Sequence, residues 1–105
     1  MPWRFGRLEK RIRLTLPLEL SSLEDPSATE RTTTENVCSL GVRVLTERSK
    51  ERNERLVIKS LADDLRALAR VVYCQRLADG RFGVGISFIG AAFDWSRASK
   101  IGAGD

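Results

Sequence analysis

The sequence predicts an all-β domain, and three observations support this. Hydrophobic and polar residues alternate from Ile12 to Leu20 and again from Phe82 to Phe88, and a period of two is typical of strands that bury one face. Asp79-Gly80, directly before the second run, is a hairpin signal. With 105 residues, of which 42% are hydrophobic and 30% charged, the chain fits one domain with one core.

The chain opens with a segment that shows no clean periodicity. Residues 1–11 carry three arginines and a lysine together with Trp3 and Phe5, and we expect them to form a flexible arm. The first strand follows from Ile12, with alternate residues on its buried face. Pro17 indicates an edge or a bulge in this strand, since proline cannot donate a hydrogen bond to a neighbouring strand.

The middle of the chain reads as short strands separated by polar segments. Strand-forming residues occupy Arg31–Val37, Val42–Leu45 and Leu56–Ile58, and loops are expected at Ser21–Glu30 and Glu47–Glu54. The first two of these strands are adjacent in sequence, which predicts a hairpin or a sharp corner between them.

The segment from Ser60 to Val72 fits two patterns. Ser60 followed by Asp63 resembles a helix cap, and the leucines that follow share one helical face, so the local pattern leans towards a helix. However, a hairpin at Asp79-Gly80 requires an upstream partner for Phe82–Phe88, and this draws Arg70–Gln75 into the sheet. The predicted β domain therefore spans residues 12–89, and residues 90–105 form a short tail for which a helix is one alternative.

Composition narrows the possible functions. The net charge of +4 suits a small anionic ligand better than a long polyanion. There is no histidine and only two cysteines, Cys38 and Cys74, which argues against a zinc site and against Ser-His or Cys-His catalysis. No apolar run is long enough for a membrane span and no signal peptide is evident, so we expect a cytoplasmic protein with both thiols reduced.

Two short motifs carry the candidate site. Arg7 and Arg11 stand four residues apart on the arm, and a guanidinium can hold a phosphate or a guanine edge with two hydrogen bonds, although arginines near a terminus are most often solvated charges. The second motif is Asn36-Val37-Cys38-Ser39-Leu40-Gly41, where Asn tolerates turn conformations and Gly41 permits a sharp turn or a close ligand approach.

Together these motifs resemble the PilZ domain, whose two signatures are RxxxR and [D/N]xSxxG. The resemblance extends from Arg7 to Phe88 and includes the alternating strand after the first motif and the closing strand. It implies a six-stranded antiparallel β-barrel that serves as a receptor for cyclic di-GMP and not as an enzyme. Arg7 and Arg11 would then close over the ligand, with Asn36, Cys38 and Gly41 beneath a guanine.

Cys38 departs from the family pattern, which has serine at this position. A thiol is a weaker hydrogen-bonding group, so the loss is about 0.5–1.5 kcal/mol, or roughly tenfold in affinity at most. Alternatively, Cys38 is a buried small apolar residue, as cysteines outside disulfides commonly are.

Two other functions remain open at this stage. A barrel that has lost its ligand would act as a protein-interaction module, and in either case an unidentified downstream protein partner is expected. A small basic barrel could instead bind single-stranded nucleic acid, but interleaved aromatic residues are missing apart from Phe82 and Phe88, which the alternation buries. No metal, further cofactor or membrane insertion is expected.

Overall fold

Antiparallel strands make up most of the structure, a computed structural model that describes residues 12–62, 65–90 and 95. Six strands have six or more residues, and a two-residue strand precedes them. Their bounds are β1 Ile12–Arg13, β2 Pro17–Ser22, β3 Thr29–Cys38, β4 Gly41–Thr46, β5 Arg55–Ser60, β6 Arg66–Arg76 and β7 Phe82–Phe88.

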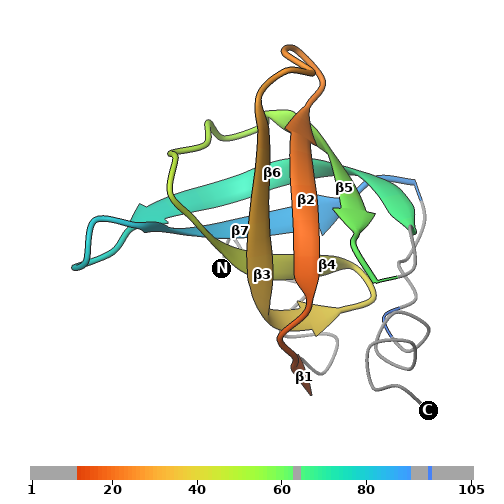
Figure 1. Ribbon diagram of the computed structural model, residues 1–105, viewed down its shortest axis with the longest axis horizontal. Coiled ribbons are helices and arrows are strands. Elements are labelled where there is room, and N and C mark those ends of the chain that lie inside the picture. Colours follow the sequence, from red (N-terminus) through yellow and green to blue (C-terminus); the bar gives the residue numbers. More distant parts are fainter. Residues whose placement is uncertain (1–11, 63–64, 91–94, 96–105) are drawn as a thin grey trace.

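The six long strands close into a ring. They are hydrogen-bonded in the order β3, β2, β5, β6, β7, β4, and a further pairing of β3 with β4 completes the circle. Figure 1 shows the result as β2 and β3 crossing in front of β6 and β7. Closure removes the open strand edges of a sheet, and the all-β barrel with six antiparallel strands is confirmed.

The core fills the inside of this ring. Five of the long strands contribute alternate aliphatic side chains, with the residues between them facing outwards, and β3 contributes the consecutive residues Val37 and Cys38. The buried hydrophobic residues on the long strands are Leu18, Leu20, Val37, Cys38, Val42, Val44, Leu56, Ile58, Ala69, Val71, Val84 and Ile86.

The first predicted strand is interrupted. β1 ends at Arg13 and β2 begins at Pro17, and Ile12, which was expected on the buried face, is 56% exposed. Proline has no N–H to donate, so it stands at the start of β2 and not within a continuous ladder. The loop expected at 21–30 is also shorter, because β2 runs to Ser22 and β3 begins at Thr29.

The helical preference of the segment after Ser60 is wrong, and the hairpin argument is right. β6 pairs with β5 from Lys59↔Arg66 to Arg55↔Arg70 and with β7 as far as Arg76↔Phe82. Gly80 adopts φ +88° in the turn between β6 and β7, which a residue without Cβ tolerates. Pairing on both sides outweighs the local helical pattern.

Beyond Gly90 the structure describes one residue, Trp95, and this residue packs on the barrel. Its side chain is 7% exposed, and its ring centroid lies 5.8 Å from that of Phe88. The Trp95 side chain therefore serves as an anchor on the barrel. The arm at 1–11 and the tail residues 91–94 and 96–105 lie outside the described residues. Of the helix considered for the tail at 90–105, the structure describes Trp95 alone, which has helical conformation.

Candidate functional site

The second motif forms a tight hairpin between β3 and β4. Asn36 and Cys38 belong to β3, Gly41 begins β4, and Cys38 pairs with Gly41 across a two-residue loop of Ser39 and Leu40. The hairpin expected between these strands is present, and Asn36 lies within β3, as in the predicted strand Arg31–Val37, two residues before the strand ends.

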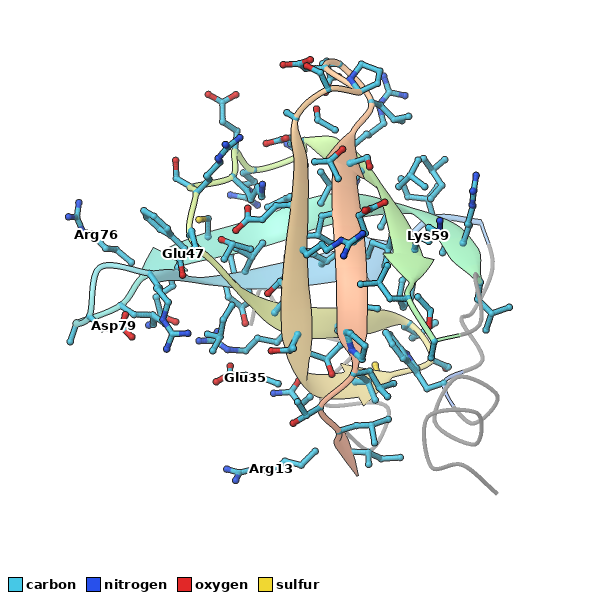
Figure 2. All side chains as sticks on the ribbon, viewed as in Figure 1. Arg13, Glu35, Glu47, Lys59, Arg76 and Asp79 are labelled. Carbon is cyan, nitrogen blue, oxygen red and sulfur yellow. The ribbon has the colours of Figure 1, made fainter. Side chains whose placement is uncertain are left out.

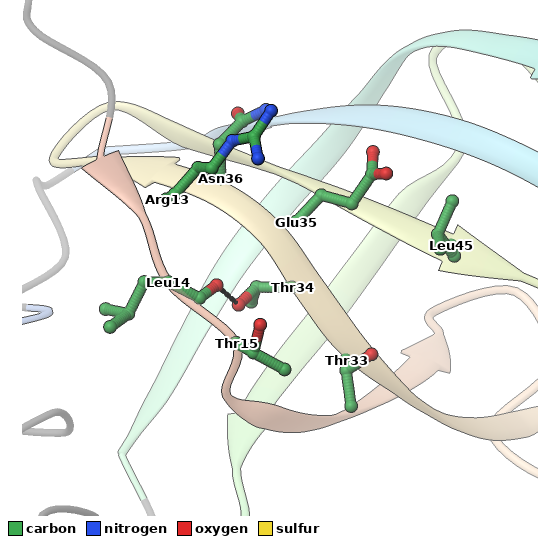
Figure 3. Close-up of a pocket in the computed structure, with 8 residues that line it drawn as sticks. All are labelled: Arg13, Leu14, Thr15, Thr33, Thr34, Glu35, Asn36 and Leu45. Atoms are coloured by element: carbon green, nitrogen blue, oxygen red, sulfur yellow. Dashed lines mark hydrogen bonds between the residues drawn. The ribbon is translucent and has the colours of Figure 1, made fainter.

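Asn36 lies beside Arg13 at one end of a surface hollow. The two residues are partners in the β1–β3 pairing, and Figure 3 shows their side chains together at the rim. The hollow has a volume of about 480 Å³ and is lined by Arg13, Leu14, Thr15, Thr33, Thr34, Glu35, Asn36 and Leu45. An amide and a guanidinium at one rim offer donors for the oxygens of a phosphate or a base.

Thr34 fixes the chain that forms one wall of the hollow. The backbone N–H of Leu16 donates to Thr34 Oγ1 over 2.9 Å, and Thr34 Oγ1 donates to the carbonyl of Leu14. In addition, the N–H of Thr34 donates to the carbonyl of Leu16 over 3.0 Å. These bonds replace regular strand pairing where the first strand is interrupted, and they hold Leu14 and Leu16 against β3.

Cys38 is only 4% exposed, so its thiol offers little surface to a ligand. Its carbonyl oxygen accepts a hydrogen bond of 2.7 Å from Trp95 Nε1. Cys38 and Cys74 are not joined in a disulfide. The motif is therefore connected to the Trp95 anchor through its backbone.

Gly41 is buried and pairs with Cys38 on one side and Ser87 on the other. Among the described glycines, positive φ angles occur at Gly80 and Gly90 and not at Gly41. Of the two roles expected for Gly41, the sharp turn is present, because Gly41 closes the two-residue hairpin loop, although without a positive φ. A close approach of a ligand to the backbone remains a prediction.

Arg43 organises the outer surface beside Asn36, its partner in the β3–β4 register. Its Nε donates to Glu35 Oε1 over 2.6 Å, and its Nη1 donates to the Tyr73 hydroxyl over 2.8 Å. The guanidinium carbon also lies 5.7 Å from the centroid of the Tyr73 ring. These contacts span β3, β4 and β6, and they compensate the carboxylate charge of Glu35 next to the hollow.

Two glycines of β7 make room for this arrangement. A Cβ on Gly83 would lie 2.2 Å from Arg43 Nη2, and a Cβ on Gly85 would lie 2.2 Å from Tyr73 Cε2. The Arg43 guanidinium and the Tyr73 ring therefore cover the bare backbone of β7 directly. This explains why glycine alternates with Val84 and Ile86 in that strand.

The environment keeps Arg43 charged. Burial acts to lower its pKa, but hydrogen bonds and charge interactions with Tyr73 and Glu35 outweigh burial, so the pKa lies above its ordinary value. The guanidinium is thus a permanent cation.

Arg7 and Arg11 lie outside the described residues. The chain that carries them nevertheless enters the barrel at the second motif, because Ile12, which follows Arg11, pairs with Val37 between Asn36 and Cys38. Consecutive Cα atoms are about 3.8 Å apart, so the arm begins beside the hairpin.

Within residues 12–62, 65–90 and 95, no group of three or more Cys, Asp or Glu side chains is arranged to hold a metal ion. The same part of the chain contains no helix with the length and apolar character needed to cross a membrane.

No family model matches the sequence, and no curated protein matches it. Among solved structures, the chain is similar to the crystal structure of the PilZ domain of CeSA from a cellulose-synthesising bacterium, with a TM-score of 0.59. The match covers 87% of this chain and 89% of that one at 22% sequence identity. The fold is a PilZ-type barrel.

Within this PilZ-type barrel, sequence reasoning missed several residues around the motif. Arg13 was expected only as an outward-facing strand residue, and Arg43 and Thr34 had no signal beyond their strand positions. The spacing of glycine in Gly83 and Gly85 was a signal that a large side chain from a neighbouring strand covers β7.

Proposed function

We propose that this chain is a cyclic di-GMP receptor that acts as a binding module without catalysis. The observation that carries the proposal is the junction of the arm with the hairpin, where β1 pairs with β3 at Asn36 and Val37. Because Arg11 directly precedes Ile12 in the sequence, this junction supports one ligand shared by the two signature motifs.

The residues of the two motifs are proposed to contact different parts of the ligand. Arg7 and Arg11 supply planar cations for the phosphates and for a guanine edge. Asn36 supplies an amide at the rim of the hollow, and Gly41 allows a base to approach the backbone. Cys38 contributes mainly backbone geometry, because its side chain is buried.

Signalling is proposed to proceed through the arm. Ligand binding orders residues 1–11 against the barrel and so presents a new surface to a downstream protein in the cytoplasm.

Calorimetric titration of the full chain with cyclic di-GMP tests the proposal. We expect saturable binding that the Arg7→Ala, Arg11→Ala double variant weakens at least about tenfold for each arginine, or about 1.4 kcal/mol each. The matched control is Arg48→Ala, Arg76→Ala, which removes two exposed charges outside the motifs. No heat at high micromolar ligand, or equal affinity in both double variants, contradicts it.

The burial of Cys38 favours one second candidate. If its thiol cannot replace the serine hydroxyl, the barrel serves as a protein-interaction module without the nucleotide. A partner that binds with the same affinity with and without cyclic di-GMP supports this alternative.

A further inference from the structure

The outer faces of β5 and β6 carry an ordered pattern of charge and apolar surface. Three cross-strand pairs lie side by side: Arg55↔Arg70, Val57↔Leu68 and Lys59↔Arg66. The residues between them, such as Leu56, Ile58 and Ala69, are buried in the core, so these pairs face outwards. The surface is thus an apolar row with a cationic row on either side.

The apolar row continues onto the end of β7. The N–H of Ile89 donates to the carbonyl of Leu68 over 2.9 Å, which sets the two residues side by side, and each is 40% exposed. Val57, Leu68 and Ile89 therefore form one stripe across neighbouring segments.

The cationic rows are not required by the fold. Like charges directly opposite each other on paired strands are destabilising, yet Arg55 faces Arg70 and Lys59 faces Arg66. Within the described part of the chain, Arg55, Arg66 and Arg70 have no carboxylate at ion-pair distance. The outward carboxylate on β2 is Glu19, which faces Lys59 and lies 3.6 Å from Arg31.

We propose that this surface binds an acidic amphipathic helix of a partner protein, with an apolar stripe against Val57, Leu68 and Ile89 and carboxylates over the two cationic rows. Adjacent strands are about 4.8 Å apart and alternate residues about 6.8 Å apart along a strand. A helix about 10 Å wide that lies along the apolar row, across the strands, therefore has its two flanks over the cationic rows, each of which is about 6.8 Å from the apolar row.

The apolar row favours a protein partner over nucleic acid. Interface centres are apolar with a charged rim, whereas surfaces that bind single strands use aromatic rings for base stacking. The outward residues of β5 and of Arg66–Arg70 on β6 include no aromatic side chain.

The surface is separate from the proposed cyclic di-GMP site. In the strand ring, β5 and β6 lie opposite β4 and β3, which carry the hairpin. Figure 2 shows Lys59 on the other side of the view from Arg13 and Glu35. The inference therefore goes beyond the proposed function, and a helix bound here does not compete with a nucleotide at Asn36.

A fluorescent 20-residue helical peptide with a leucine stripe flanked by glutamates provides the test, by anisotropy titration with the full chain. We expect micromolar binding that weakens at higher salt and that Arg55→Glu, Arg70→Glu reduces at least about tenfold. The matched control, Arg48→Glu, Arg76→Glu, has the same net charge and should retain the affinity of the unmodified chain.

Two further probes separate the alternatives. A peptide in which the glutamates are kept and the leucines are replaced by serine should bind the unmodified chain at least several-fold more weakly. The original peptide should likewise bind the Leu68→Ser variant at least several-fold more weakly than it binds the unmodified chain. This variant tests the apolar row even if the Arg55→Glu, Arg70→Glu variant does not fold. No peptide binding, equal loss in both charge-reversed variants, or binding of a dT15 oligonucleotide in place of the peptide overturns the proposal. Cyclic di-GMP is absent throughout, so the result does not depend on that ligand.

Discussion

The contact between Gly85 and Tyr73 makes a quantitative prediction about the surface beside Asn36. In Gly85→Ala, the new Cβ would lie 2.2 Å from Cε2 and 2.6 Å from Cζ of Tyr73. The ring must therefore swing away from β7, and its hydroxyl then loses the 2.8 Å hydrogen bond from Arg43. Overpacking of this kind costs about 1–3 kcal/mol of unfolding free energy.

In a Tyr73→Ala background, the same Gly85→Ala substitution is expected to raise the free energy of unfolding. In Tyr73→Ala the ring is absent, and Gly85 has no positive φ that would make alanine strained. Replacing glycine by alanine at such a position stabilises a protein by about 0.4–1 kcal/mol, because the unfolded chain loses conformational freedom. The coupling free energy between the two substitutions is thus at least about 1.4 kcal/mol.

Urea unfolding of the four proteins in this cycle, followed by tryptophan fluorescence, measures the coupling. Gly83→Ala is the matched control, because its Cβ meets the end of the Arg43 side chain, which can move more easily than a ring. We expect a smaller loss there. If Gly85→Ala is equally costly with and without the Tyr73 ring, the steric explanation is refuted.

Three other predictions concern separate parts of the barrel. Arg55→Glu converts a like-charge pair with Arg70 into an opposite-charge pair, and urea unfolding at low salt should show a gain of about 0.2–1 kcal/mol that shrinks at high salt. Cys38→Ser should leave cyclic di-GMP affinity nearly unchanged in calorimetry, because the side chain at this position is only 4% exposed; a gain of up to about tenfold would mean that a hydroxyl there contacts the ligand. The pKa of Asp79 lies below its ordinary value of 3.8 because the backbone N–H and then the guanidinium of Arg81 donate to it. Its contribution to stability is therefore present above that value and is lost as pH falls through the folded-state pKa, so Asp79→Asn should be less stable than the unmodified chain near neutral pH and equally stable at acidic pH.

The closed barrel could be predicted because its signals are local or nearly so. Alternation marks β7, and the Asp79-Gly80 turn demands a partner strand for it. That demand correctly identified a strand at Arg70–Gln75 where the helical pattern pointed elsewhere. The interruption at Leu14–Leu16 was harder to foresee, since it depends on Thr34, 18 residues from Leu16, accepting a hydrogen bond from it.

The surface around Asn36 was predictable only in part. The [D/N]xSxxG spacing identifies the hairpin, but the sequence does not say which side chains surround it. Arg43 reaches Glu35, Tyr73 and Gln75, which are 8, 30 and 32 residues away. Such contacts follow from the strand order and the strand register of the closed ring. Neither the order nor the register can be predicted from a local sequence pattern.

The backbone of the hairpin explains how either cysteine or serine can occupy position 38 without changing the shape of the motif. Val37 pairs with Ile12, the carbonyl of Cys38 accepts from Trp95, the N–H of Phe88 donates to the carbonyl of Leu40 over 2.9 Å, and Gly41 pairs with β7. None of these bonds uses the side chain at position 38. Exchanging sulfur for oxygen there therefore alters contact chemistry while the backbone stays in place, and any change in ligand affinity can be assigned to that one atom.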